Sequence, residues 1–240
     1  MIYFVLPAYN EKGNIGELIG SIGGVFGEGE YRIIAVNDGS VDGTGDILEA
    51  MSGKYPVDIV DHKVNRGLGA ALKSGYLAAV SAAGDSDIII TMDSDNTHPP
   101  ELAGEMAEKI RGGSDIVIAS RFSGGREVGL SLARKVFSRG ARFLLRLFFP
   151  YPGLRDYTCG YRALSGVFLR RCVEHYGEGF ITEKGFTCTV EVLVKALVLG
   201  PVISEVPLTL RYDRKVGASK LRVIRTVLRY FILIFKLKII

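Results

Sequence analysis

The sequence predicts an α/β fold, with a mostly parallel sheet flanked by helices, and three observations support this prediction. Short apolar runs rich in β-branched residues alternate with helix-like segments through the first half of the 240 residues. Hydrophobic residues make up 48% of the chain and charged residues 23%, which is enough to fill a core and excludes a disordered protein. Polar residues directly follow three of the apolar runs, as expected where parallel strands end at a ligand site.

The first half of the chain contains five expected strands separated by four expected helices. The strands are short and apolar, as in a sheet buried on both faces, and they span Ile2–Leu6, Ile33–Val36, Val57–Val60, Ile88–Met92 and Ile116–Ala119. The helices span Gly13–Phe26, Gly43–Met51, Leu68–Ala83 and Pro99–Arg111. Two prolines open the last of these helices, where a missing N–H costs little.

The sequence pattern of the second half of the chain predicts two amphipathic helices. Ser131–Phe149 places four cations on one face (Lys135, Arg139, Arg142 and Arg146), and a terminal helix repeats the design with Arg222, Arg225, Arg229 and Lys236. Cations on one side and aromatic and aliphatic residues on the other are typical of helices at a membrane interface. Between them we expect a helix over Thr187–Leu199 and a strand over Val202–Tyr212. The predicted organisation is one domain over residues 1–220, followed by an amphipathic membrane-surface helix over residues 221–240.

The charge is distributed unevenly along the chain. The 30 basic and 26 acidic residues give a net charge of +4, but residues 211–240 hold nine basic and one acidic, and residues 121–146 hold seven and one. The remainder carries 14 basic and 24 acidic residues, a net charge of −10. This asymmetry indicates an anionic partner: nucleic acid, a phosphorylated substrate or a membrane surface. Because the aromatic residues do not alternate with the cations as a base-stacking platform would, we expect no nucleic-acid partner.

Several protein classes are excluded. Three widely spaced cysteines form no disulfide framework and are typical of reduced thiols in the cytosol. The first residues lack the basic leader and long apolar run of a secretory signal. The best candidate for a membrane span, Thr226–Ile240, is interrupted by Arg229, Lys236 and Lys238, whereas a span needs about 20 mostly apolar residues.

Two polar turns carry candidate chemistry. Asp93 and Asp95 follow a buried strand, and two carboxylates one residue apart can hold Mg²⁺ or Mn²⁺ against a diphosphate. Asp38, at the end of another strand, could accept hydrogen bonds from a nucleobase edge. In both turns the alternative is simple helix capping. Glu183 and Glu191 likewise could serve only to cap or to pair.

Nine short motifs in order along the chain carry a family resemblance. The motifs are Leu6-Pro-Ala-Tyr-Asn-Glu11, Asn37-Asp-Gly-Ser-Val-Asp-Gly-Thr44, Gly67-Leu-Gly-Ala70, Met92-Asp-Ser-Asp95, His98-Pro-Pro-Glu101, Ser120-Arg-Phe122, Asp156-Tyr-Thr-Cys-Gly-Tyr-Arg162, Glu205-Val-Pro207 and Arg214-Lys-Val-Gly-Ala-Ser-Lys-Leu221. With these motifs the sequence resembles the family 2 glycosyltransferases with the GT-A (Rossmann-like) fold, and within them the dolichyl-phosphate mannose synthases and related polyprenyl-phosphate glycosyltransferases.

The resemblance implies a role for each matching residue. The residues implied to line the nucleotide pocket are Pro7, Tyr9, Glu11, Val36 and Asp38. Those implied to hold ribose, diphosphate and metal are Asp93, Ser94 and Asp95. Those implied to grip the donor and acceptor phosphates are Arg121, Arg134, Ser138, Arg214 and Lys220, and the catalytic set is Asp95, Arg121, Arg214 and Lys220. Thr97 stands where relatives commonly carry a metal-binding Gln, and its shorter side chain weakens the case for a third ligand.

The expected activity is inverting, metal-dependent transfer of a hexose to a polyprenyl or dolichyl phosphate by a peripheral protein at the cytoplasmic face of a membrane. The resemblance favours mannose from GDP-mannose. UDP-glucose or another nucleotide sugar is an alternative that no named pocket residue decides. An alternative of another class is a non-catalytic, membrane-associated module that binds nucleotide sugars, and donor hydrolysis or transfer with Mn²⁺ would distinguish the two.

Overall fold

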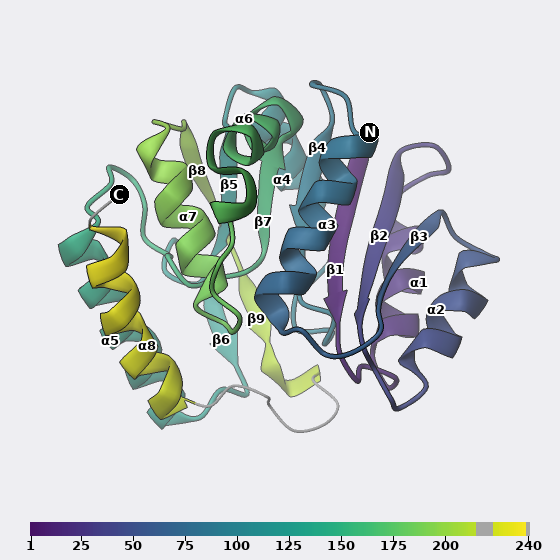
Figure 1. The fold of residues 1–240 in the computed structure, drawn as a ribbon, viewed down its shortest axis with the longest axis horizontal. Coiled ribbons are helices and arrows are strands. Elements are labelled where there is room, and N and C mark those ends of the chain that lie inside the picture. The colour runs from purple at the N-terminus through teal and green to yellow at the C-terminus, as the bar shows by residue number, and fades with distance from the viewer. Residues whose placement is uncertain (215–222, 239–240) are drawn as a thin grey trace.

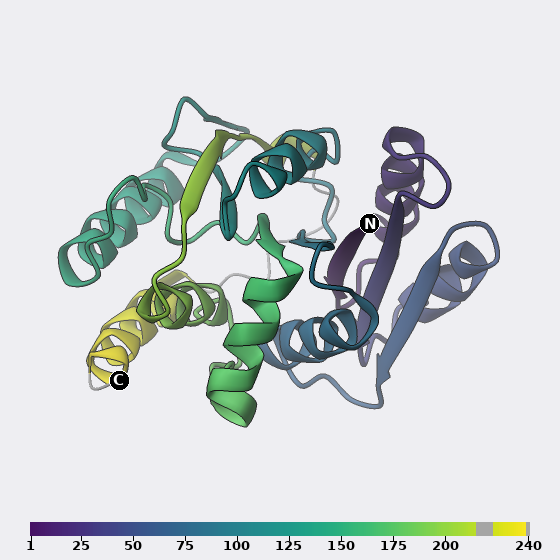
Figure 2. The same cartoon turned by 90° about the horizontal axis from the view of Figure 1, so that it is seen from above.

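The computed structural model describes residues 1–214 and 223–238, and they form a central sheet covered by helices on both faces (Figures 1 and 2). The seven strands of this sheet have the order β3-β2-β1-β4-β7-β5-β8. All neighbours are parallel except β7, which is antiparallel to both β4 and β5. The expected mostly parallel α/β fold is therefore confirmed.

The elements of the first half are β1 (Ile2–Ala8), α1 (Ile15–Val25), β2 (Tyr31–Asp38), α2 (Thr44–Ser52), β3 (Val57–His62), α3 (Leu68–Ala82), β4 (Ile88–Thr91), α4 (Leu102–Arg111) and β5 (Ile116–Ser120). Each expected strand and helix is present. β2 and β3 extend beyond their apolar runs because polar residues at their ends still pair, with Asn37 opposite Asp61 and Asp38 opposite His62. Main-chain hydrogen bonding, which the apolar pattern does not report, sets these ends.

The elements of the second half are β6 (Arg126–Val128), α5 (Leu132–Phe148), β7 (Arg162–Ser165), α6 (Gly166–Tyr176), η1 (Gly177–Gly179), α7 (Cys188–Val198), β8 (Ile203–Pro207), β9 (Thr209–Arg211), η2 (Tyr212–Arg214) and α8 (Val223–Leu237). The single strand expected over Val202–Tyr212 is wrong, because it divides at Leu208. The Leu208 N–H donates to the Ser120 carbonyl, while its own carbonyl accepts from Arg126 N. The chain thus leaves the large sheet and pairs with β6 instead.

The helices form two layers and a separate pair. α3, α6 and α7 cover one face of the sheet, and α1, α2 and α4 cover the other (Figure 2). α5 and α8 pack side by side at one end of the molecule, beside α7 (Figure 1). Among the described residues, no helix is long and apolar enough to cross a membrane.

The strand order creates a switch point at β1. The chain runs outward from β1 to β2 and β3 and then returns to β4 on the other side of β1. The loops after β1 and β4 therefore diverge, which leaves a crevice at the carboxyl ends of these strands, the usual ligand site of such sheets.

Candidate active site

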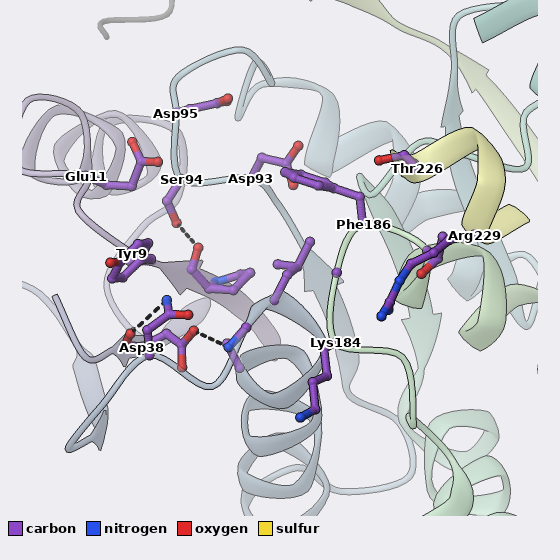
Figure 3. A pocket seen from close by; sticks show the side chains of 18 residues that line it. Tyr9, Glu11, Asp38, Asp93, Ser94, Asp95, Lys184, Phe186, Thr226 and Arg229 are labelled. Carbon is purple, nitrogen blue, oxygen red and sulfur yellow. Dashed lines mark hydrogen bonds between the residues drawn. The ribbon is translucent and has the colours of Figure 1, made fainter. Parts of the chain in front are cut away.

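Two adjoining cavities open at the carboxyl edge of the sheet. The first has a volume of about 490 Å³ and lies over the ends of β1, β2 and β4 (Figure 3). The second has a volume of about 220 Å³ and extends toward α5 and α8. Among the described residues, five lie in both walls, which are Leu68, Asp93, Asp95, Phe186 and Thr226. A molecule in one cavity would therefore lie against a molecule in the other.

The ends of β1 and β4 form one side of the first cavity. Pro7 lines it from the end of β1, Tyr9 and Glu11 line it from the loop after β1, and Ser94 lines it from the loop after β4. The Ser94 hydroxyl donates to the Pro7 carbonyl across 2.9 Å. This hydrogen bond ties the loop after β4 to the end of β1 at the switch point.

Asp38 lines the same cavity from the end of β2 but is already well supplied with donors. Its Oδ1 accepts from Arg66 N at 2.9 Å and lies 2.7 Å from His62 Nδ1, while its Oδ2 accepts from Gly67 N at 2.8 Å. His62 Nε2 lies 2.9 Å from the hydroxyl of Ser74 on α3. Sequence reasoning assigned no role to His62, whose buried ring orients Asp38 and ties β2 and β3 to α3.

Asp93 and Asp95 lie where the two cavities meet. The Asp93 side chain is 42% exposed, whereas Asp95 is buried. The Thr97 hydroxyl donates to Asp95 Oδ1 at 2.7 Å, and the Thr97 N–H donates to the same oxygen at 3.3 Å. Thr97 thus supports Asp95 directly; whether it also binds metal stays a prediction.

The donor set at this junction fits a divalent cation shared with a substrate. Among the described residues there is no group of three or more His, Cys, Asp or Glu side chains able to enclose a metal ion. Mg²⁺ commonly takes one or two carboxylates and fills its other positions with phosphate oxygens and water. Asp93 and Asp95 offer hard oxygens of this kind beside a cavity large enough for a nucleotide.

Arg121 is the central cation of the second cavity. Asp156 binds its guanidinium at 2.7 and 2.8 Å, and its Nη2 also donates to the Thr158 hydroxyl at 2.6 Å. Although burial alone would lower the pKa of Arg121, the neighbouring Asp156 charge raises it. Ser138 of α5 lines the same cavity, and its buried Oγ has no hydrogen-bond partner among the described residues. The guanidinium is paired with Asp156 and also lies 3.8 Å from Glu127, so it and the Ser138 hydroxyl would bind an anionic ligand as hydrogen-bond donors rather than as an uncompensated positive charge.

The remaining wall comes from segments that sequence reasoning did not connect with the site. Lys184, Phe186 and Thr187 precede α7, and Thr226 and Arg229 lie on α8. Figure 3 shows Thr226 and Arg229 on the side of the cavity away from Tyr9 and Glu11. A sequence signal that could have indicated this wall is Gly67-Leu-Gly69, whose glycines pack against the segment before α7.

Most of the sequence-predicted site residues lie at the two cavities, with a few exceptions. Val36 is fully buried in β2 beneath Gly75 of α3, and the described cavity walls do not include it. Arg134 and Arg214 have described backbones in α5 and η2, but their side chains lie outside the described part of the chain. Lys220 lies wholly outside the described residues. The roles of these three cations stay predictions.

Solved structures share the fold. Glucosyl-3-phosphoglycerate synthase from Mycobacterium tuberculosis, in complex with Mn²⁺, UDP and glucosyl-3-phosphoglycerate, superposes with a TM-score of 0.66 at 21% identity over 95% of this chain and 74% of its own. At this identity the likeness concerns the fold alone, and it confirms the expected GT-A architecture.

Sequence relatives are closer. The chain is 33% identical over 235 residues to dolichol-phosphate mannosyltransferase of Pyrococcus furiosus, covering 97% of this chain and 62% of the relative. It is 29% identical to polyprenol monophosphomannose synthase of Mycolicibacterium smegmatis, covering 90% and 79%, and 31% identical to undecaprenyl-phosphate mannosyltransferase of Micrococcus luteus, covering 90% and 86%. The family model of glycosyl transferase family 2 matches residues 3–172. The chain therefore belongs to glycosyltransferase family 2.

Proposed function

We propose that the chain transfers a hexose, most simply mannose from GDP-mannose, to a polyprenyl or dolichyl phosphate with inversion at the anomeric carbon. The observation that carries this proposal is the pair of adjoining cavities. Four carboxylates, from Glu11, Asp38, Asp93 and Asp95, lie in the wall of the first cavity, the second contains Arg121, and the two share the wall at Asp93 and Asp95. Relatives named as mannosyltransferases of dolichyl, polyprenyl and undecaprenyl phosphates support the choice of sugar and acceptor.

In this proposal the first cavity takes the nucleotide. Its volume of about 490 Å³ lies within the range of small-molecule sites. Pro7, Tyr9, Glu11 and Asp38 would surround the base and ribose, with Ser94 at the ribose. Asp93 and Asp95 would hold Mg²⁺ or Mn²⁺, which would neutralise charge on the diphosphate leaving group.

The second cavity would take the acceptor phosphate. A phosphate monoester has a second pKa of about 6, so it is largely dianionic at pH 7 and needs no strong general base. Its oxygen would attack the anomeric carbon while the bond from that carbon to the diphosphate breaks, and the electron pair leaves with the nucleoside diphosphate. Arg121 and Ser138 would hold the attacking phosphate close to the sugar, aided by Arg134, Arg214 and Lys220.

We also propose that α5 and α8 lie on a membrane surface, with the chain attached peripherally at the cytoplasmic face. Large apolar side chains are exposed on both helices, and they are Leu132, Val136, Phe137, Phe143, Leu147, Phe231, Ile232 and Phe235. Exposed apolar side chains on a pair of amphipathic helices are typical of contact with a membrane or partner. Three buried, unpaired cysteines are consistent with a reducing compartment. The division into a catalytic domain (1–220) and a surface helix (221–240) belongs to the same proposal.

A panel of nucleotide sugars offered with one radiolabelled polyprenyl phosphate and Mn²⁺ tests the function. We expect a labelled glycolipid with GDP-mannose and none, or far less, with UDP-glucose. Preference for UDP-glucose would change the donor but keep the reaction. Binding of nucleotide sugar without hydrolysis or transfer would instead support the non-catalytic module.

A further inference from the structure

Glu183 lies between the segment before α7 and the terminal helix α8. Its Oε2 is 3.3 Å from Arg229 Nη1 and accepts from the Thr187 hydroxyl at 2.8 Å, and its Oε1 is 3.5 Å from Lys236 Nζ. The Glu183 side chain is only 14% exposed, whereas those of Arg229 and Lys236 are about 40% exposed or more. One largely buried carboxylate thus forms ion pairs with two cations that lie two helical turns apart on α8.

A second acidic residue, Glu191 of α7, binds the backbone of the segment that carries Glu183. The fully buried Glu191 accepts from the N–H groups of Thr182 and Glu183, at 2.9 and 2.8 Å, and forms an ion pair with Lys195 at 2.6 Å. Burial by itself would raise the pKa of Glu191, but Lys195 and these hydrogen bonds hold it below its ordinary value. Glu191 therefore stays charged and fixes the backbone from which the Glu183 side chain projects.

The helix α3 also contacts the backbone of this segment. Gly69 N donates to the Lys184 carbonyl at 3.1 Å. A Cβ at Gly69 would lie 1.7 Å from the Glu183 carbonyl oxygen, so only glycine permits this approach. With its backbone fixed by α3 and α7, the segment offers α8 a rigid acidic docking point.

This docking point adjoins the wall common to both cavities. Phe186, three residues after Glu183, lines both cavities, as does Thr226 of α8. Arg229 lines the first and Tyr230 the second. Glu183 and Lys236 are absent from the described walls of both cavities, so any effect of these two residues on turnover would act through the residues that they hold, Arg229 among them.

We propose that Glu183 is a positioning residue, which ties α8 to residues 182–187 and so makes the terminal helix part of the active site as well as a membrane contact. This inference rests on the proposed function and adds a requirement to it. If α8 only recruited the protein to a membrane, its docking on Glu183 would not matter to an acceptor that needs no membrane. If α8 builds the shared wall, docking would matter for every acceptor.

A short-chain, water-soluble isoprenyl phosphate used without membranes separates these two cases. We expect Glu183→Gln to lower kcat/KM at least tenfold with this acceptor and to raise the KM for the nucleotide sugar. Lys236→Gln should show a smaller loss in the same direction, and Glu183→Asp should retain more activity than Glu183→Gln. Glu178→Gln is the matched control, because it removes a solvent-exposed ion pair with Lys73 that lies outside the described cavity walls.

Hydrogen exchange of the full chain without ligands gives a readout that does not depend on activity. Glu183→Gln should speed exchange of the backbone amides at 182–187 and in α8, whereas Glu178→Gln should not. If the wild-type chain transfers sugar to the water-soluble acceptor and Glu183→Gln does so at the same rate, the positioning role of Glu183 is overturned. If the wild-type chain transfers no sugar, the proposed function fails, and unchanged exchange in Glu183→Gln would then also overturn the docking of α8.

Discussion

Asp156 binds the guanidinium of Arg121 through both of its carboxylate oxygens, with Oδ1 2.7 Å from Nη2 and Oδ2 2.8 Å from Nε. The Asp156 side chain is fully buried, and that of Arg121 is 12% exposed. Glu205 completes the arrangement, since its Oε1 accepts from Asp156 N at 2.8 Å. The cation proposed to hold the acceptor phosphate is thus oriented by a carboxylate that is itself fixed by another.

Replacing Asp156 with Asn should therefore impair both stability and turnover. Removing one partner of a buried ion pair leaves the other charge uncompensated, which typically costs about 3–5 kcal/mol in the free energy of unfolding. Because Arg121 lines the second cavity, we also expect the substitution to raise the KM for the lipid acceptor more than the KM for the donor. Denaturant unfolding and steady-state kinetics measure the two effects. An Asp156→Asn variant of wild-type stability would contradict the role of the pair.

The same pair predicts how stability depends on pH. Burial by itself would raise the pKa of Asp156, but the charge and hydrogen bonds of Arg121 hold it below the ordinary value of 3.8. The folded protein then binds fewer protons than the unfolded chain in acid, so this contribution is present above the ordinary pKa and lost as the pH falls through the folded pKa. The unfolding free energy of wild type should fall more steeply below about pH 4 than that of Asp156→Asn. Equal slopes would contradict the depressed pKa.

His62→Leu should weaken nucleotide binding without removing any cavity residue. The substitution deletes the 2.7 Å contact with Asp38, and a hydrogen bond to a charged group contributes about 1.5–3 kcal/mol. We expect the unfolding free energy to fall by about that amount, and the affinity for nucleoside diphosphate, measured by calorimetry, to fall several-fold. Ser74→Ala removes only the outer hydrogen bond and should have the smaller effect on both. Unchanged affinity in His62→Leu would show that Asp38 needs no support from the ring.

Gly69→Ala should be far more harmful than alanine at another helical glycine. The added methyl would meet the Glu183 carbonyl at 1.7 Å, and displacing backbone to relieve such overpacking costs about 1–3 kcal/mol. At Gly104 of α4 an added methyl group would have no neighbouring atom within 4 Å, so Gly104→Ala should be neutral or stabilising through helix propensity. Thermal unfolding and nucleotide binding compare the two. Equal melting temperatures would contradict the close approach of α3 to residues 182–187.

Membrane contact should depend on the exposed apolar side chains of α5 and α8. Phe143 is 72% and Phe235 68% exposed, and burying one such ring stabilises binding by about 1.5–3 kcal/mol. Replacing both with Glu should reduce binding to anionic phospholipid vesicles at least tenfold while leaving turnover with a water-soluble acceptor intact. Val167→Glu, on α6, changes an exposed residue of another face and serves as the control. Vesicle binding that survives the double substitution would refute the membrane surface.

The strands of the first half were predictable because their signal is local. Buried apolar runs bounded by turn residues identify β1 to β5, and the carboxylates at their ends lie at the expected edge of the sheet. β7 was missed because it begins with the buried Arg162, whose guanidinium donates to the Tyr157 and Thr189 carbonyls. No local pattern indicates that a charged residue will find such partners elsewhere in the chain.

For the terminal helix too, the local sequence pattern did not indicate which distant residues its side chains would contact. Its amphipathic pattern was visible, and Arg222, Arg225, Arg229 and Lys236 were expected to share one face of the helix, opposite its aromatic and aliphatic residues. Arg229 and Lys236 instead contact Glu183, which lies 46 residues before Arg229 in sequence. A salt bridge between distant segments depends on the packing of α8 against α7, which the charge pattern of the helix alone does not specify.

The most direct test of the account is transfer of radiolabelled mannose from GDP-mannose to a polyprenyl phosphate, comparing wild type with Asp95→Ala in the presence of Mn²⁺. Asp95 lines both cavities and should be required for transfer, while the circular dichroism spectrum and melting curve of the variant should remain those of a folded protein. We expect a labelled mannosyl lipid with wild type and none with Asp95→Ala. Equal product from both proteins, or no transfer by wild type from any nucleotide sugar, would contradict it.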